Sequence, residues 1–189
     1  MTQKEILSIF EKTGAILKGH FKLSSGLHSA QYLQCVRVLQ HPEYAAALCK
    51  TLAVKFSPRP TAVIAPALGG IVVSYEVARA LGARSLFTER VDGKMTLRRG
   101  FELTKNDNVL VVEDVVTTGL STKEVIEVVK PHGPKLIGVG CLVDRSGNKI
   151  DFGTRFESLI KIDIPTFKPE TCPMCKVKTP LTKPGSRTI

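Results

Sequence analysis

Residues 109–122 read VLVVEDVVTTGLST, and this stretch determines the expected architecture. Its aliphatic, β-branched first half predicts a strand over 108–113 that is buried on both faces. Two acids follow at once, Glu113 and Asp114, and then a hydroxyl-rich loop over 114–120 that opens a helix expected over 121–130. Open α/β sheets bind ligands beyond the carboxyl ends of their strands. We therefore expect the acids and the loop to lie at a ligand-binding edge.

The segments around this stretch repeat the same strand–helix pattern. Short apolar runs predict strands over 61–65, 84–88 and 135–143, the last broken by two glycines, and amphipathic spacing predicts helices over 42–55 and 71–81. Such alternation is typical of an α/β fold with a central parallel sheet flanked by helices. Residues 66–70 form a tight loop between strand and helix. The polar segment 89–101, centred on Asp92 and Gly93, predicts a hairpin or a mobile loop.

The N-terminal region follows a different pattern. Thr2 and Glu5 form a capping-box signature for a helix that ends at Gly14. A polar loop over 19–26 and a strand over 31–36 are expected next. The chain shows no repeat or linker, so residues 1–189 are interpreted as a single domain.

Composition limits the class of protein. The chain has 189 residues, 43% hydrophobic and 23% charged, which excludes general disorder. No apolar run reaches the roughly 20 residues of a membrane span, and the N-terminus lacks a signal-peptide pattern, so we expect a cytoplasmic protein without a membrane partner. The net charge of +10 is compatible with nucleic acid, an anionic membrane surface or a small polyanionic substrate.

Of the five cysteines, only Cys172 and Cys175 have the spacing of metal ligands. A structural zinc ion takes four ligands, usually from two such pairs. The chain has no second pair of this kind, and its histidines, at positions 20, 28, 41 and 132, show no paired spacing. An ordered tail with two thiols is the favoured interpretation, and a zinc site in the tail is the alternative.

The loop after the acids suits a phosphate group. Backbone N–H groups at a helix N-terminus attract anions, hydroxyl groups donate further hydrogen bonds, and Gly119 lets the backbone approach closely. The carboxylates of Glu113 and Asp114 would instead bind vicinal hydroxyls, as acids do on ribose. Together these features predict a site for a ribose 5-phosphate group. The chain contains neither GxxxxGK[ST] nor GxGxxG, which separates it from the P-loop and Rossmann classes.

Residues 113–122 resemble the phosphoribosyl diphosphate motif of the type I phosphoribosyltransferases. Further segments resemble the orotate-specific members of that family: FKLSSG at 21–26 with Ser29 and Tyr32, PALGG at 66–70, MTLRRGF at 95–101, VDR at 143–145, and the tail with Cys172, Cys175 and 183–187. The resemblance runs in order along nearly the whole chain. It implies the type I fold, with a core over about 41–149 and a small hood formed by about 1–40 and 150–189.

The resemblance implies transfer of 5-phosphoribosyl from 5-phosphoribosyl 1-diphosphate to orotate, giving orotidine 5′-phosphate and pyrophosphate, with Mg²⁺ held mainly by the substrate. Catalysis would then rest on positioning and electrostatics. The implied phosphoribosyl diphosphate site comprises Glu113, Asp114, Val115, Val116, Thr117, Thr118, Gly119, Leu120 and Ser121, with Leu68 and Gly69 at the pyrophosphate.

Other positions also match functional positions of the family, and each of them has an ordinary structural explanation as an alternative. Arg145, Thr117 and Tyr32 correspond to orotate-binding positions, although an ion pair of Arg145 with Asp144 or a core role for Tyr32 would also explain them. Arg90 and Lys94 correspond to a mobile loop that reaches the neighbouring subunit, with Lys94 as a catalytic residue together with Glu113 and Asp114. This implies a homodimer, and a solvated basic hairpin is the alternative.

The chain departs from better-known bacterial members of the family at Ser24 and Gly69, where those proteins have Lys, and its loop over 89–101 is shorter. These differences affect individual residue roles more than the reaction. Two other functions remain as alternatives: a phosphoribosyltransferase for a purine base, and a non-catalytic regulator that senses phosphoribosyl diphosphate and binds nucleic acid. No helix-turn-helix pattern supports the regulator.

Overall fold

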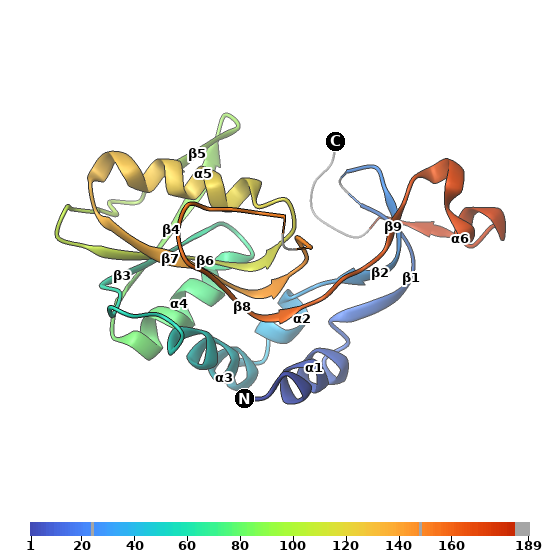
Figure 1. Cartoon of the computed structure of the whole chain (residues 1–189), viewed down its shortest axis with the longest axis horizontal. Helices are drawn as coiled ribbons and strands as arrows, with labels where there is room; N and C mark the ends of the chain where they lie inside the picture. Colours follow the sequence, from blue (N-terminus) through green and yellow to red (C-terminus); the bar gives the residue numbers. More distant parts are fainter. Residues whose placement is uncertain (24, 148, 184–189) are drawn as a thin grey trace.

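The strands of the chain form two sheets, which the computed structural model describes over residues 1–23, 25–147 and 149–183 (Figure 1). The larger sheet has the strand order β5-β4-β3-β6-β7-β8, and the smaller has the order β10-β1-β2-β9. Ser24 and residues 184–187, which contributed to the family resemblance, lie outside the described residues. Figure 1 places the small sheet and the C-terminal segment at one end of the molecule.

The large sheet confirms the predicted α/β class. Its strands β3 (Ala62–Pro66), β4 (Arg84–Val91), β6 (Asn108–Val116), β7 (Lys135–Asp144) and β8 (Phe156–Lys161) are all parallel to their neighbours. Only the edge strand β5 (Lys94–Leu97) is antiparallel. The parallel strands have their carboxyl ends at one edge, which positions the loops that follow them together.

Helices cover both faces of this sheet (Figure 1). Helices α3 (Pro42–Ala53) and α4 (Gly70–Leu81) pack on one face, and α5 (Leu120–Val129) packs on the other. Side chains alternate along each strand, so Val63 and Leu110 join the first hydrophobic cluster while Ile64 and Val111 join the second. Because both faces are covered, the strands are as apolar as the sequence predicted.

Strand β7 is continuous, whereas the sequence predicted a break at its two glycines. A Cβ at Gly138 would lie 3.0 Å from the ring of Phe56, and a Cβ at Gly140 would lie 3.1 Å from it. The glycines therefore give Phe56 room to lie flat against the strand. They are packing positions within a strand that continues through them, although the register with β6 shifts beside Gly138, between the pairs Val109–Leu136 and Leu110–Gly138.

The small sheet corrects the N-terminal prediction. The segment expected to be a loop contains strand β1 (Ile16–Lys22), which pairs antiparallel with β2 (His28–Leu33). A register shift between Lys18 and Phe21 contains Gly19, so this glycine marks a bulge within a strand. The expected strand over 31–36 begins and ends earlier, and its last residues lead into the short helix α2 (Val36–Leu39).

The C-terminal segment is divided between the two sheets. Strand β8 belongs to the large sheet, while β9 (Thr166–Phe167) pairs with β2 and β10 (Leu181–Thr182) pairs with β1. The small sheet thus takes up less of the segment 150–189 than the expected hood did. Between β9 and β10 lie a 3₁₀ turn, Pro169–Thr171, and the short helix α6 (Pro173–Lys176).

The predicted helix boundaries agree with the structure. The helix α1 (Gln3–Lys12) begins at Thr2 with both hydrogen bonds of a capping box to Glu5, and Gly14 adopts a left-handed conformation just after it. Helix α5 ends in a 3₁₀ turn, Lys130–His132. Among the described residues, no helix is both long enough and apolar enough to cross a bilayer.

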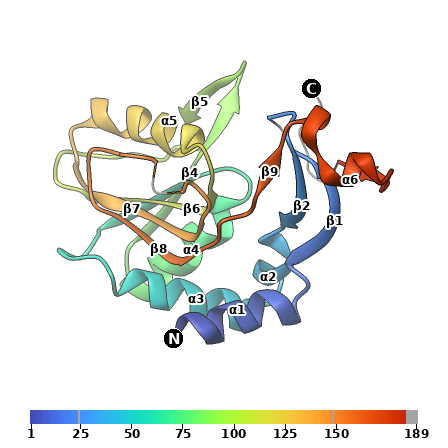
Figure 2. The ribbon, with the colours of Figure 1, turned by 45° about the vertical axis from the view of Figure 1, so that its right-hand side comes forward.

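Of the two alternatives for 89–101, the structure has the hairpin. Strands β4 and β5 are joined by a two-residue turn at Asp92 and Gly93, whose φ values are 49° and 79°. Positive φ at both central residues matches the twist of an antiparallel pair. In Figure 2 the hairpin extends beyond the rest of the large sheet.

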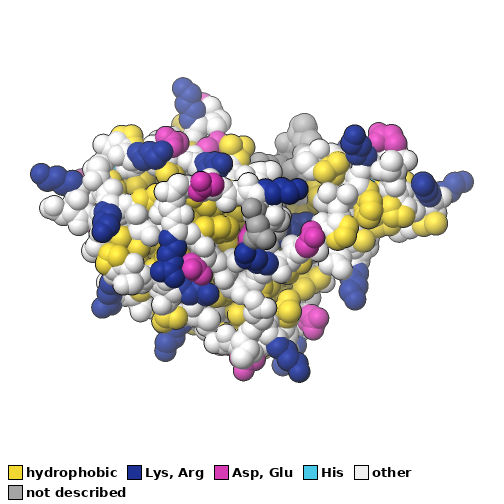
Figure 3. Space-filling view, in the orientation of Figure 1, with side chains coloured by type: hydrophobic (Ala, Val, Ile, Leu, Met, Phe, Trp, Pro, Cys, Tyr) yellow, Lys and Arg dark blue, Asp and Glu magenta, His cyan; other side chains and the backbone are white. Residues whose placement is uncertain are grey.

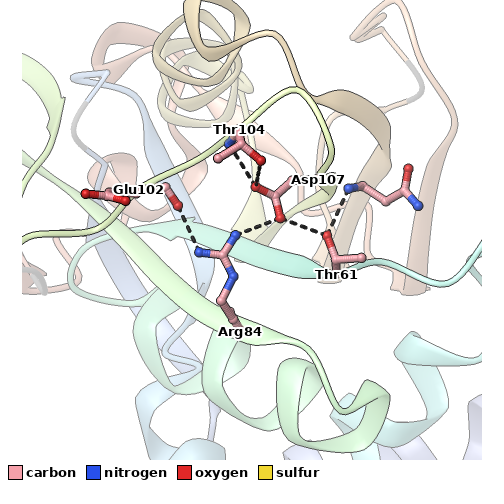
Figure 4. A network of polar contacts seen from close by, with 6 residues as sticks. Thr61, Arg84, Glu102, Thr104 and Asp107 are labelled. Atoms are coloured by element: carbon pink, nitrogen blue, oxygen red, sulfur yellow. Dashed lines mark hydrogen bonds and ion pairs between the residues drawn. The ribbon is translucent and has the colours of Figure 1, made fainter.

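A buried carboxylate ties the amino ends of the large-sheet strands together (Figure 4). Asp107, 7% exposed, accepts hydrogen bonds from the guanidinium of Arg84 at 2.7 Å, from the Thr61 hydroxyl at 3.0 Å and from the backbone N–H of Thr104 at 2.8 Å. Arg84 also donates to the carbonyl of Glu102. Burial alone would raise the pKa of Asp107, but these hydrogen bonds outweigh it and lower the pKa to about 2.

This network gives the protein a pH-dependent contribution to stability. Asp107→Asn is expected to lower the free energy of unfolding at neutral pH by about 1–2 kcal/mol, a range reduced because Arg84 is half exposed. The folded-state pKa lies below the unfolded value of about 4, so the difference should disappear as the pH falls from about 4 to about 2. Urea unfolding at several pH values measures it, with Asp163→Asn as the control. A difference that persists at pH 2 would contradict this role.

Candidate active site

Both acids lie within β6, because the strand continues to Val116. The sequence predicted that the strand would end at Glu113 and that Asp114 would begin the loop, so the prediction was wrong for Asp114. Glu113 is buried, with 8% of its surface exposed, and Asp114 is half-buried. One carboxylate oxygen of Asp114 accepts the backbone N–H of Val115 at 2.9 Å. The pair therefore sits at the carboxyl edge of the sheet with restricted side-chain freedom.

The loop between β3 and α4 lies directly against this pair. A Cβ added to Gly69 would stand 2.9 Å from Oδ2 of Asp114, and one added to Gly70 would stand 3.4 Å from Oε1 of Glu113. The Ala67–Leu68 peptide bond in the loop is cis, and Leu68 is exposed. The structure thus brings together two segments, 66–70 and 113–114, that the sequence analysis assigned to one site.

The surroundings of Asp114 disfavour its charge. Burial raises the pKa of Asp114 above its ordinary value, although hydrogen bonds with Val115 and Glu113 act in the opposite direction. A carboxylate that is destabilised in the free protein gains from a ligand that supplies positive charge or hydroxyl donors. Raised carboxyl pKa values are typical of functional sites.

The loop after the acids forms a small concavity. A cavity of about 50 Å³ is lined by residues of 113–122, among them Thr117, Thr118 and Ser121. Gly119 has φ of 71° and directly precedes α5, and a Cβ there would come within 2.9 Å of Ile150 and 3.1 Å of Phe152. Only glycine fits this position, because the φ angle is positive and because a Cβ would have no space. The backbone N–H groups that begin a ten-residue helix therefore face a space suited to a small anion.

Arg145 follows the end of β7, next to the end of β6. Its backbone N–H bonds to the carbonyl of Val116 at 2.8 Å, and its half-buried guanidinium interacts electrostatically with Tyr32 of the small sheet. Burial lowers the pKa of Arg145. Its Nε is buried and has no hydrogen-bond partner among the described residues. No ion pair between Arg145 and Asp144 is found in the described part of the chain, and one carboxylate oxygen of Asp144 accepts the backbone N–H of Ser146 at 2.8 Å.

Tyr32 reaches the same region from β2, and its partial burial raises its pKa. It contacts the ring of Phe21 with centroids 5.8 Å apart. Cys35, which the sequence analysis treated only as a buried hydrophobe, has its sulfur 3.9 Å from the carbonyl oxygen of Asp114. No sequence signal distinguishes Cys35 from the other buried cysteines. The small sheet and the large sheet thus both contribute residues beside the acid pair.

The basic hairpin is largely occupied by ion pairs within the chain. Arg90 binds both carboxylate oxygens of Glu124 on α5, and Arg98 and Arg99 bind Glu89. Lys94 forms no ion pair with any residue that the structure describes. Glu124 was missed as a partner because it lies 34 positions away on another element.

The basic side chains on one face of the molecule are dispersed. On the face shown in Figure 3, Lys and Arg are spread among neutral and apolar surface. The charge of +10 therefore does not produce one basic patch on this face.

Comparisons with known proteins agree with the geometry. The family model for the phosphoribosyl transferase domain matches residues 37–163. The orotate phosphoribosyltransferase of Desulforamulus reducens is 56% identical to this chain over 190 residues, and the alignment covers all of both chains. The orotate phosphoribosyltransferase of Thermotoga maritima is 53% identical over 183 residues, which cover 96% of this chain and 98% of the relative.

The solved structure of orotate phosphoribosyltransferase from Aeropyrum pernix superimposes with a TM-score of 0.71 at 27% identity, covering 83% of this chain and 93% of that one. The family model, which matches two thirds of the chain, and these relatives define the class of the protein as a phosphoribosyltransferase. The chain belongs to this family and, within it, to the orotate phosphoribosyltransferases.

Proposed function

We propose that the chain transfers the 5-phosphoribosyl group of 5-phosphoribosyl 1-diphosphate to orotate, releasing pyrophosphate. The observation that carries this proposal is the joint placement of Asp114, the loop over 117–121 and Arg145 at one sheet edge. A phosphate, a ribose and a carboxylate-bearing base match these three groups in turn. None of the five cysteines, all of which the structure describes, is paired in a disulfide bond, which supports a reducing compartment such as the cytoplasm.

The phosphate end binds at the start of α5. Thr117, Thr118 and Ser121 supply hydroxyl donors, and the backbone N–H groups after Gly119 supply the positive end of the helix dipole. Val115, Val116 and Leu120 contribute backbone and shape to the same site.

The acids act on the ribose. Glu113 and Asp114 accept hydrogen bonds from its vicinal hydroxyls and stabilise the positive charge that develops on the sugar as the bond to pyrophosphate breaks. Leu68 and Gly69 bring backbone beside Asp114 at the side where the diphosphate leaves. The carboxylate oxygens of this pair also fit a hard cation. When bound, Mg²⁺ would neutralise diphosphate charge, held mainly by substrate oxygens.

Orotate binds between the two sheets. The guanidinium of Arg145 donates to its carboxylate or imide edge, which gives the buried Nε a partner. Thr117 contributes a hydroxyl on one side and Tyr32 an aromatic ring on the other. Lys94 extends on the β4–β5 hairpin, and we propose that it serves the diphosphate of a neighbouring copy in a homodimer. We propose the same role for Arg90, whose guanidinium bonds to Glu124 of α5 within this chain.

The test is the loss of orotate absorbance in the presence of 5-phosphoribosyl 1-diphosphate and Mg²⁺, with pyrophosphate release measured in parallel. Adenine and hypoxanthine serve as competing acceptors. Release with a purine but not with orotate would overturn the substrate assignment. Absence of turnover with every base would overturn the activity.

Arg145→Lys is expected to raise the KM for orotate by about tenfold or more while changing the KM for 5-phosphoribosyl 1-diphosphate much less. Lysine retains the charge but cannot donate two parallel hydrogen bonds. Steady-state kinetics with each substrate varied in turn measures the split. Equal changes in both constants would show that Arg145 does not contact orotate.

Gly69→Ala is expected to lower kcat by about tenfold or more with little loss of stability. Gly69 has a helical φ of −58°, so alanine is unstrained there, but its Cβ would overlap the carboxylate of Asp114. Asp114 must then leave the position fixed by the N–H of Val115. A misplaced catalytic group commonly reduces rate without unfolding the protein. Ala46→Gly on the neighbouring helix, scored by kinetics and melting temperature, is the control, and an unchanged kcat in Gly69→Ala would contradict this placement.

A further inference from the structure

Four metal-binding side chains converge at the far end of the small sheet. His20 lies on β1, His28 on β2, and Cys172 and Cys175 lie at the start and within α6. One donor atom from each of the four lies within 4.8 Å of all the others. His20, His28 and Cys172 are 3%, 4% and 0% exposed, and Cys175 is partly exposed. The pair of cysteines that lacked partners in the sequence therefore meets a pair of histidines across the β1–β2 hairpin.

The spacing of the donor atoms fits a tetrahedral zinc ion. Bond lengths of about 2.3 Å to sulfur and about 2.0–2.1 Å to nitrogen place the ligand atoms of such an ion about 3.3–3.8 Å apart. Nε2 of His20 lies 3.5 Å from the sulfur of Cys172 and 3.7 Å from that of Cys175. Nδ1 of His28 lies 3.2 Å from the sulfur of Cys175 and 2.9 Å from Nε2 of His20. Two of these four distances, 2.9 and 3.2 Å, fall below this range, and the largest separation within the cluster, up to 4.8 Å, exceeds it, so a bound ion requires small side-chain adjustments.

The hydrogen bond on the other side of His20 prepares this residue to bind a metal. Its Nδ1 lies 2.8 Å from the carbonyl oxygen of Thr179. A carbonyl oxygen can only accept, so Nδ1 carries the proton and Nε2 of the neutral ring presents its lone pair to the cluster. A backbone carbonyl that fixes the tautomer in this way is typical of metal-binding histidines. One lone pair cannot satisfy His28, Cys172 and Cys175 together, whereas a cation satisfies all four groups.

The surroundings also lack the usual means of holding such a segment. The two hydrophobic clusters of the described chain include no residue of 17–32 or 163–183. The buried residues of these two segments are His20, Phe21, His28, Ser29, Ile164 and Cys172, so Phe21 and Ile164 are the only large hydrophobic side chains buried among their described residues. Figure 2 shows the C-terminal segment crossing the outer end of the small sheet, away from the large one. Small units that cannot build an apolar core are commonly held by a metal ion or a disulfide.

We propose that His20, His28, Cys172 and Cys175 bind a structural zinc ion that fixes the C-terminal segment to the small sheet. Two thiolates and two imidazoles are the soft and borderline ligands that favour zinc over magnesium or calcium. Two thiolates also balance the charge of the ion, which allows its burial. Protein ligands fill all four positions, so the site is closed and its role is structural. Tyr32 lies on the same strand as His28, so this site also supports one wall of the proposed orotate site.

The first test is the metal content of the purified full-length protein, measured by mass spectrometry of the metal after growth in zinc-containing medium. We expect about one zinc per chain in the wild type and less than about one tenth of that in a Cys172→Ser, Cys175→Ser double variant. Cys49→Ala, which alters a buried cysteine of α3 outside the cluster, is the matched control and should keep its zinc. Cobalt in place of zinc should give the visible absorption of a tetrahedral thiolate site.

If the double variant fails to fold, a second measurement on the wild type still tests the proposal. Removal of zinc from the wild type by a chelator should expose the segment 163–183 to limited proteolysis, and added zinc should restore its protection. Three results would overturn the proposal: wild-type protein that contains no zinc and takes up no cobalt, full zinc content in the double variant, or a Cys172–Cys175 disulfide in place of two metal-bound thiolates. None of these readouts depends on transferase activity, so the metal site and the proposed function fail separately.

Discussion

Asp114→Asn is expected to lower kcat for orotidine 5′-phosphate formation by about 10²–10³-fold. The amide keeps the shape of the side chain but cannot stabilise the positive charge that develops on the ribose. Glu113 remains, so some activity should persist. Steady-state kinetics measures the loss, and Asp163→Asn, which changes an exposed acid outside the site, should leave kcat unaffected. A loss below about threefold would remove Asp114 from the reaction.

The same substitution should stabilise the free protein. Burial raises the pKa of Asp114 in the folded state, so ionisation of this carboxyl group opposes folding once the pH exceeds its unfolded value of about 4. Asn carries no charge, and the variant should therefore melt at a higher temperature at neutral pH, by about 2–4 °C for each kcal/mol gained. The difference should vanish below about pH 4. Opposite effects on rate and stability would separate a catalytic role from a structural one.

Lys94→Ala is expected to lower kcat by about 10²–10³-fold alone, and mixing it with Asp114→Asn should restore activity. If Lys94 serves the neighbouring copy, a mixed dimer combines an intact Lys94 from one chain with an intact Asp114 from the other. Random pairing of equal amounts makes half of the dimers mixed, each with one complete site, so activity should recover to about a quarter of the wild-type value.

Co-expression of the two variants followed by kinetics tests this recovery. Lys50→Ala, at an exposed position on α3, controls for the loss of one lysine and should retain full activity. Recovery of nothing beyond the sum of the two variants would show that each site uses its own hairpin. Light scattering of the wild type gives the oligomeric state independently.

The parallel sheet could be predicted because its strands carry strong local signals. Buried β-branched runs such as 109–112 and capping residues such as Thr2 determine local structure almost by themselves. Strand β1 could not be predicted in this way. Its polar residues and Gly19 are compatible with a strand only because β2 and β10 supply hydrogen-bonding partners from elsewhere in the chain.

The candidate site likewise contains features that the sequence could predict and features that it could not. The acid pair and the loop after it are contiguous in sequence, so the motif could be recognised before the fold. The contact of Gly69 with Asp114 and the ion pair of Arg90 with Glu124 connect separate elements. The histidine–cysteine cluster is the extreme case, because His20 and Cys172 lie 152 positions apart. The cysteine pair alone has the spacing of metal ligands, and the two histidines show no such spacing.

The order in which the small sheet is completed has a consequence for synthesis on the ribosome. Every strand of the large sheet has been translated by Lys161, but β1 and β2 still await β9 and β10 from the last part of the chain. A nascent chain can therefore assemble its large sheet while the β1–β2 hairpin keeps two unpaired edges. Contacts of such long sequence separation form slowly, and open strand edges invite association with other chains. A released chain truncated at residue 165 should therefore have a folded large sheet and a hairpin that chaperones recognise.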